Sequence, residues 1–152
     1  MNDVEEVTFC GLYCGLCASR RRIPQQAATF RQTLCQEGCD RGYFDIPGLG
    51  TVFAAFWEGL NCLADQPCPG CRHGGGNPDC ALRTCARERG VVASPLCAES
   101  PCARLNILEN YPLLAADGKR MQSIGIEQWA AEQEARARRG LAYADLRLPE
   151  ET

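Results

Sequence analysis

Apolar residues recur at helical spacing in several stretches of the chain, and the clearest of these covers residues 49–64. Its apolar positions follow the spacing i, i+3, i+4, i+7 and i+8: Leu49, Val52, Phe53, Phe56, Trp57, Leu60 and Leu63. Burying such side chains contributes about 1.5–3 kcal/mol each. We therefore expect a helix at 49–64 whose apolar residues supply much of the hydrophobic core.

Shorter amphipathic patterns predict further helices, over 25–36, 80–90, 101–110, 113–123 and 126–139. In the last of these, one face is lined by Ile126, Trp129, Ala130 and Gln133. A short extended piece is expected at 91–95. These patterns together predict a mainly α protein, a small helical domain with irregular cysteine-rich segments.

Two segments, residues 3–19 and 65–79, show no regular period. The second, "DQPCPGCRHGGGNPD", contains three prolines and four glycines, which interrupt helices and strands. Both segments are rich in cysteine and bury little apolar surface. A bound metal ion is therefore the expected means of holding them in place.

The length of 152 residues fits a single domain, 1–152. The order along the chain is a first cysteine motif (1–22), a helical body (23–66), a second cysteine-rich segment (67–104), C-terminal helices (105–140) and a tail (141–152).

The charge balance argues against nucleic acid as a partner. Sixteen basic and nineteen acidic residues leave a net charge of −3, whereas binding to phosphates needs a basic surface. No stretch reaches the roughly 18 apolar residues of a membrane span, and the acidic start "MNDVEEVTF" does not resemble a signal peptide. We expect a cytoplasmic protein without a membrane partner. Since cytoplasmic thiols are kept reduced, its twelve cysteines indicate metal binding rather than a disulfide framework.

The strongest cysteine pattern is C-x2-C-x8-C-x4-C, formed by Cys68, Cys71, Cys80 and Cys85. The turn "CPGC" directs its two sulfurs toward one point, and four thiolates around one ion form a closed structural zinc site. The alternative for these four residues is a set of simple buried thiols.

A second pattern, C-x3-C-x2-C, lies in "CGLYCGLC" and comprises Cys10, Cys14 and Cys17. Radical S-adenosylmethionine enzymes hold a [4Fe–4S] cluster by this spacing, but the chain lacks the strand–helix alternation of their barrel. Cys97 or Cys102 is the expected fourth ligand. The resulting site would hold either Zn²⁺ or a [4Fe–4S] cluster, and the spacing does not choose between them.

The remaining candidates have less specific patterns. Cys35, Cys39 and Cys62 are expected to be buried core thiols, with a third four-cysteine site as the alternative. His73, the single histidine, is expected in a solvent-exposed loop, with replacement of one cysteine ligand as the alternative.

Five segments, in the order "CGLYCGLC", "CPGCR", "CALRTCARERGV", "PCARL" and "GIEQWAAEQEAR", resemble the cysteine-rich bacterial and archaeal domain-of-unknown-function family 3795. The resemblance covers about residues 8–139 and implies a metal-binding protein. It carries over nine cysteines: Cys10, Cys14, Cys17, Cys68, Cys71, Cys80, Cys85, Cys97 and Cys102. Two departures are Ser94, where members commonly have another cysteine, and the tail "GLAYADLRLPEET", which lacks the cysteines of a zinc ribbon found in many members.

Three functions follow from these patterns. The favoured one is structural zinc supporting a module that binds a protein partner. The alternative is a [4Fe–4S] protein for electron transfer or sensing. An enzyme or metal carrier with an open metal position is third, and its candidate bases are the acidic residues near cysteines: Glu5, Glu6 and Glu99.

Overall fold

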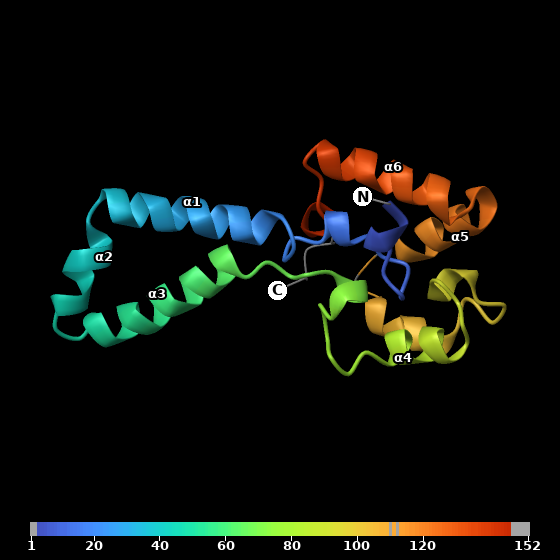
Figure 1. Ribbon diagram of the computed structural model, residues 1–152, viewed down its shortest axis with the longest axis horizontal. Coiled ribbons are helices and arrows are strands. Elements are labelled where there is room, and N and C mark those ends of the chain that lie inside the picture. Colours follow the sequence, from blue (N-terminus) through green and yellow to red (C-terminus); the bar gives the residue numbers. More distant parts are fainter. Residues whose placement is uncertain (1–2, 110, 112, 147–152) are drawn as a thin grey trace. The chain divides into compact units, whose positions relative to one another are not determined.

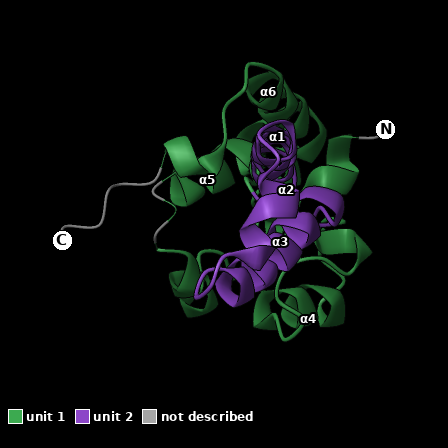
Figure 2. Cartoon of the chain, turned by 90° about the vertical axis from the view of Figure 1, so that its left-hand side faces the viewer, with its two compact units in different colours: residues 1–18, 69–152 green, residues 19–68 purple. Residues whose placement is uncertain are grey.

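The computed structural model describes residues 3–109, 111 and 113–146, and the chain forms two compact units. Unit 1 comprises residues 1–18 and 69–152, and unit 2 comprises residues 19–68 (Figure 2). The expectation of one domain, 1–152, stays a prediction. The last part of the predicted tail, residues 147–152, lies outside the described residues.

The fold is mainly α, as the sequence predicts (Figure 1). The α-helices are α1 (Arg22–Gln36), α2 (Cys39–Gly42), α3 (Gly50–Asp65), α4 (Ala81–Glu88), α5 (Leu114–Ile124) and α6 (Ile126–Arg138). Among the described residues, extended pairing is limited to one isolated bridge between Val7 and Tyr13. Over the same residues, no helix has both the length and the apolar character that crossing a bilayer requires.

Most predicted helices are confirmed to within a few residues, and two short segments differ. The segment predicted as a helix over 101–110 forms the 3-10 helix η6 (Ala103–Leu108), and residue 110 lies outside the described residues. The segment expected to be extended contains the 3-10 helix η5 (Ser94–Leu96). Pro95 fits in its first turn, where a missing N–H costs nothing.

Unit 2 is a helical hairpin in which α1 and α3 pack along each other, with α2 and the 3-10 helix η3 (Tyr43–Asp45) in the connection (Figure 1). The expectation that α3 buries all seven of its apolar residues is wrong. Only Phe53 and Leu60 are buried, whereas Val52 is 66% exposed and Leu63 is 52% exposed. The physical reason is that α1 and η3, the neighbours of α3 in this unit, cover only one side of the helix.

The core of unit 1 forms around α6. The 3-10 helices η1 (Asp3–Glu6) and η2 (Cys14–Leu16) pack on α6, and α5 packs on both α6 and η5. The fully or nearly fully buried cluster consists of Val7, Tyr13, Leu16, Ala93, Met121, Trp129, Ala130 and Tyr143. The predicted apolar face of α6 is confirmed, because Trp129, Ala130 and Gln133 are completely buried.

Tyr13 fastens the first cysteine motif to this core. Its side chain is fully buried and meets the Trp129 ring edge-on, with ring centroids 6.3 Å apart. Its backbone N–H donates to the Tyr143 hydroxyl at 2.9 Å, and its own hydroxyl donates to Oε2 of Glu134 at 3.1 Å. Burial and the Glu134 carboxylate raise the pKa of Tyr13. Tyr13 is therefore a packed structural residue.

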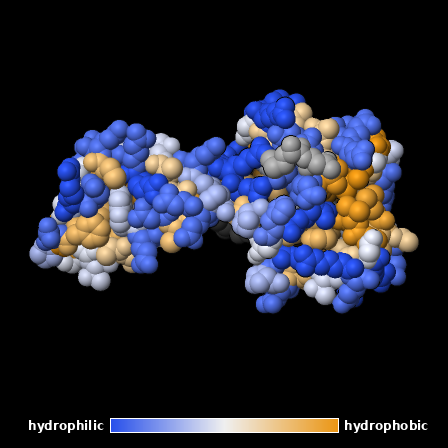
Figure 3. Space-filling view, in the orientation of Figure 1, coloured by the Kyte–Doolittle hydropathy of each residue, from blue (hydrophilic) through white to orange (hydrophobic). Residues whose placement is uncertain are grey.

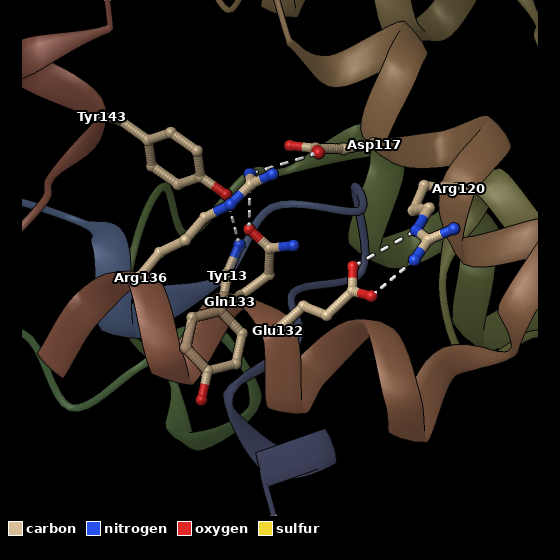
Figure 4. A network of polar contacts seen from close by, with 7 residues as sticks. All are labelled: Tyr13, Asp117, Arg120, Glu132, Gln133, Arg136 and Tyr143. Atoms are coloured by element: carbon tan, nitrogen blue, oxygen red, sulfur yellow. Dashed lines mark hydrogen bonds and ion pairs between the residues drawn. The ribbon is translucent and has the colours of Figure 1, made fainter. Parts of the chain in front are cut away.

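Polar contacts continue from this cluster to the interface of α5 and α6 (Figure 4). Arg136 donates to Oε1 of Gln133 at 3.1 Å and lies 3.6 Å from Oδ1 of Asp117. Arg120 of α5 pairs with Glu132 of α6 at 2.6 Å. Asp117 is only 7% exposed, and its burial raises the pKa of its carboxyl, although the positive charge of Arg136 opposes the shift.

The raised pKa of Asp117 predicts a pH dependence of stability. A carboxyl with a higher pKa in the folded state keeps its proton where the unfolded chain has already released it. The contribution of Asp117 to the free energy of unfolding should therefore fall as pH rises from the ordinary carboxyl pKa of 3.8 toward the folded value. Asp117→Asn should reduce this slope, measured by urea unfolding at a series of pH values. Equal slopes for the two proteins would contradict the assignment.

Gly11, directly after Cys10, provides a second prediction. Its φ is +91°, and a Cβ at this position would overlap the ring of Pro95. Gly11→Ala should lower the free energy of unfolding by about 1–2 kcal/mol for the backbone conformation, plus about 1–3 kcal/mol for the overlap. Gly74→Ala is the control, because Gly74 has φ +86° in the left-handed region and open space around its Cβ position. Denaturant unfolding should show the larger loss for Gly11→Ala, and equal losses would count against the overlap.

Candidate functional site

The first cysteine motif begins in a tight loop closed by backbone contacts. The Thr8 N–H donates to the Leu12 carbonyl at 2.8 Å, and the Leu12 N–H donates to Oγ1 of Thr8 at 2.9 Å. Cys10 lies in this loop with its Sγ 3.0 Å from the same Thr8 oxygen. Burial raises the pKa of the Cys10 thiol. The loop thus holds the Cys10 sulfur at a fixed, largely desolvated position.

Cys14 and Cys17 follow on one turn of 3-10 helix. Cys14 begins η2, and the N–H of Cys17 donates to its carbonyl at 3.0 Å. Side chains three residues apart lie above one another in a 3-10 helix, so the two cysteines share one side of the turn. The Cys14 thiol is buried, and its Sγ accepts a hydrogen bond from the backbone N–H of Cys71 at 3.4 Å.

Cys71 and Cys80 bring the second cysteine-rich segment to this loop. Cys71 begins the 3-10 helix η4 (Cys71–His73), and Cys80 is the N-cap residue of α4. Both lie close enough to Cys10 for their charges to raise its pKa. We call Cys10, Cys14, Cys71 and Cys80 the first cysteine set.

The first cysteine set is a group of neighbouring thiols rather than an assembled coordination sphere. Over the described residues, no three cysteine, histidine, aspartate or glutamate side chains stand in an arrangement able to hold a metal ion as they lie. The structure therefore defines which cysteine-bearing segments lie next to each other.

Arg72 connects three segments around the first cysteine set. Its Nε donates to the Val7 carbonyl at 2.7 Å, and its Nη2 donates to the Val92 carbonyl at 2.8 Å. The guanidinium lies 4.5 Å from the centre of the Phe9 ring, with Arg87 also over this ring at 5.2 Å. Because Arg72 follows Cys71 and Phe9 precedes Cys10, these contacts hold the two cysteines in register.

Arg83 organises the glycine-rich loop between Cys71 and Cys80. Its side chain is 9% exposed, and its Nη2 donates to the carbonyls of Gly75 at 2.7 Å and Asn77 at 3.0 Å. These hydrogen bonds to its backbone carbonyls fix the conformation of a loop that has no apolar side chains to pack.

A second group, Cys85, Cys97 and Cys102, lines a separate cavity of about 190 Å³. We call it the second cysteine set. Nη1 of Arg104 donates a hydrogen bond to Sγ of Cys85 at 2.7 Å, and Nη1 of Arg89 donates to Sγ of Cys97 at 3.8 Å.

The predicted quartet of Cys68, Cys71, Cys80 and Cys85 is thus divided. Since a helix turns about 100° per residue, Cys80 and Cys85 point about 140° apart on α4. Cys80 approaches the first set and Cys85 the second. Cys97 and Cys102, expected to complete the opening trio, line the cavity of Cys85 instead.

Two of the acidic residues near the cysteines lie beside basic side chains. Glu99 binds Arg89 at 2.7 Å, which lowers the pKa of Glu99 and makes it a weaker base. Glu5 lies 3.9 Å from the exposed His73 ring, and Glu6 is buried.

Cys102 also lines a second cavity of about 370 Å³ between η6 and α5.

Outside the two cysteine sets, Cys17 lies in unit 1, and unit 2 contains Cys35, Cys39, Cys62 and Cys68. All twelve cysteines are free of disulfides. Cys68 is the last residue of that unit, and its carbonyl accepts a hydrogen bond from Arg20 at 3.0 Å. The expectation of buried thiols is correct for Cys39 and wrong for Cys35 and Cys62, which lie on exposed helix surfaces.

Sequence reasoning did not identify the arginines that shape both cysteine sets. Arg72, Arg83 and Arg104 lie within the motifs "CPGCR", "CALRTC" and "PCARL". Their adjacency to cysteine was the available signal, but the partners of Arg72 and Arg83 are backbone carbonyls, which leave no pattern in the sequence.

Arg72→Lys tests the role of the arginine fork. Lysine keeps the charge but cannot hold both carbonyls at once. The free energy of unfolding should fall by about 1–3 kcal/mol, the range for hydrogen bonds to a charged group. Arg41→Lys, in a residue whose side chain is 80% exposed, is the control and should change little in the same urea titration. Equal stability of both variants would remove Arg72 from this role.

Comparison with known proteins agrees with the cysteine motifs. The family model described as "Protein of unknown function (DUF3795)" matches residues 6–107, a range that includes both cysteine sets. No curated protein and no solved structure matches the chain. Because the match covers more than half of the 152 residues, the chain belongs to this cysteine-rich DUF3795 family of unknown function.

Proposed function

We propose that this protein binds a zinc ion through the first cysteine set and that the ion is structural, supporting a module that binds a protein partner. The observation that carries the proposal is the convergence of Cys10, Cys14, Cys71 and Cys80 from separate segments. The hydrogen bond from the Cys71 N–H to the Cys14 sulfur joins residues 57 positions apart in the chain.

The donors fit the chemistry of zinc. Four thiolates at about 2.3 Å form the tetrahedral arrangement of structural zinc sites. Thr8 and the Cys71 amide already contact the sulfurs of Cys10 and Cys14. Such hydrogen bonds orient ligands from outside the coordination sphere. When bound, the ion would supply cross-links between segments that lack a hydrophobic core.

The second cysteine set is the place for a second ion. Three thiolates on a divalent ion leave a net negative charge, and Arg89 and Arg104 are positioned to compensate it. Cys17 and Cys68 remain predicted ligands from the sequence. A protein partner is favoured over nucleic acid because the chain carries a net charge of −3, and the cytoplasmic location stays a prediction.

Mutation of single cysteines tests the first set. Cys10→Ser and Cys71→Ser should each lower zinc content, measured by elemental analysis, and lower the melting temperature in the same preparation. The loss should be large, because structural zinc contributes about 10–16 kcal/mol in small zinc peptides. Cys35→Ser is the control and should keep both properties, since this cysteine is exposed in unit 2.

Full zinc content in both Cys10→Ser and Cys71→Ser would overturn the proposal. The protein is purified without oxygen from an iron-replete host, so that a visible spectrum separates the two chemistries. If the protein instead contains iron and acid-labile sulfide and shows a broad visible band, the same cysteines hold a [4Fe–4S] cluster rather than zinc.

A further inference from the structure

Helix α3 carries two apolar stripes, and α1 covers one of them. The residues on the covered side include Phe53 and Leu60. The other side, which we call the outer stripe, consists of six exposed, uncharged residues: Val52, Ala55, Phe56, Gly59, Cys62 and Leu63. Their spacing of i, i+3, i+4, i+7, i+10 and i+11 places them within roughly 120° of the helix circumference.

The outer stripe has the pattern of a core-facing surface but lies open to solvent. Val52 is 66% exposed, Phe56 is 40% exposed and Leu63 is 52% exposed. Phe30 of α1, itself 49% exposed, extends this surface, because its ring centre lies 6.0 Å from that of Phe56. Figure 3 shows apolar side chains reaching the surface of unit 2 among hydrophilic ones.

The size of unit 2 indicates that such a surface needs cover. A segment of this length buries only about 60% of its unfolded surface, and the smallest domains usually need metals, disulfides or association. Among the described residues of unit 2, the large aliphatic and aromatic side chains that are buried are Phe53 and Leu60. A second helix pair against α3 would provide the missing half of a core.

One pair of residues on the outer stripe, Phe56 and Gly59, is complementary in size across a two-fold axis. We consider two antiparallel α3 helices related by a two-fold axis midway between Trp57 and Glu58. This axis places Phe56 opposite Gly59 of the second copy and Val52 opposite Leu63 of the second copy. A large ring then meets the one position on the stripe that has no side chain, and this relation holds in both directions, as a two-fold interface requires.

Charge also favours a second copy. The outer stripe contains no charged residue, and unit 2 has equal numbers of basic and acidic residues: Arg20, Arg21, Arg22, Arg31 and Arg41 against Glu37, Asp40, Asp45, Glu58 and Asp65. Five positive and five negative charges sum to zero, so two such units do not repel each other.

We propose that this protein forms a homodimer in which the outer stripes of two α3 helices pack antiparallel and the two hairpins become a four-helix bundle. The dimer buries Val52, Phe56 and Leu63 of each copy. It depends on unit 2 and is independent of metal binding by the cysteine sets.

Adjacent substitutions on α3 test the interface in the full chain under reducing conditions. Ala55→Glu places a charge in the outer stripe, and Ala54→Glu places the same charge one residue away, on the polar side of the helix. Both alanines are exposed, so neither change disturbs the fold of one copy. Sedimentation equilibrium should give a dimer for the wild type and for Ala54→Glu, and at least a tenfold higher dissociation constant for Ala55→Glu.

Gly59→Leu separates association from folding. No atom lies within 4 Å of a Cβ built at Gly59, and leucine favours helix over glycine. Helix content by circular dichroism should therefore be kept or raised, while the side chain fills the space for Phe56 of the second copy and dissociates the dimer. A monomeric wild type, or a dimer that both Ala55→Glu and Gly59→Leu leave intact, would overturn the proposal.

Discussion

Arg72 is the constraint on which the cysteine-bearing side of unit 1 depends. One guanidinium holds the Val7 and Val92 carbonyls and covers the Phe9 ring, so it ties together three segments that share little apolar surface. Its position next to Cys71 makes the backbone of the second cysteine-rich segment follow that of the first. The Cys71 N–H then reaches the Cys14 sulfur.

Unit 1 is therefore stabilised in two different ways on its two sides. Around α6, the aromatic residues Tyr13, Trp129 and Tyr143 form a conventional core. Around the cysteines, hydrogen bonds from arginines to backbone carbonyls take the place of a core. Arg72 holds separate segments together in this way, and Arg83 fixes the backbone of the glycine-rich loop. Tyr13 joins the two sides, because it lies between Cys10 and Cys14 and is itself buried in the core.

Periodicity predicted the long helices well, because a repeat of apolar residues depends only on local geometry. It could not decide how many sides of α3 are covered, since Val52 and Phe53 fit a helical stripe equally and only the presence of α1 separates them. The cysteine motifs led to the right family, but spacing did not divide Cys80 from Cys85. That division follows from the turn of α4 between them. The roles of Arg72 and Arg83 were beyond prediction, because their partners are backbone carbonyls, which every residue possesses.

The position of unit 2 in the chain has an evolutionary consequence. Its fifty residues leave unit 1 after Ala18 and return at Pro69, and the contact between Cys14 and Cys71 closes the chain just inside these two points. A loop closed at its base tolerates changes of length at small entropic cost. Insertions or deletions within residues 19–67 should therefore leave the contacts among the cysteines of unit 1 in place. The two parts of the chain are then under separate constraints as the sequence changes.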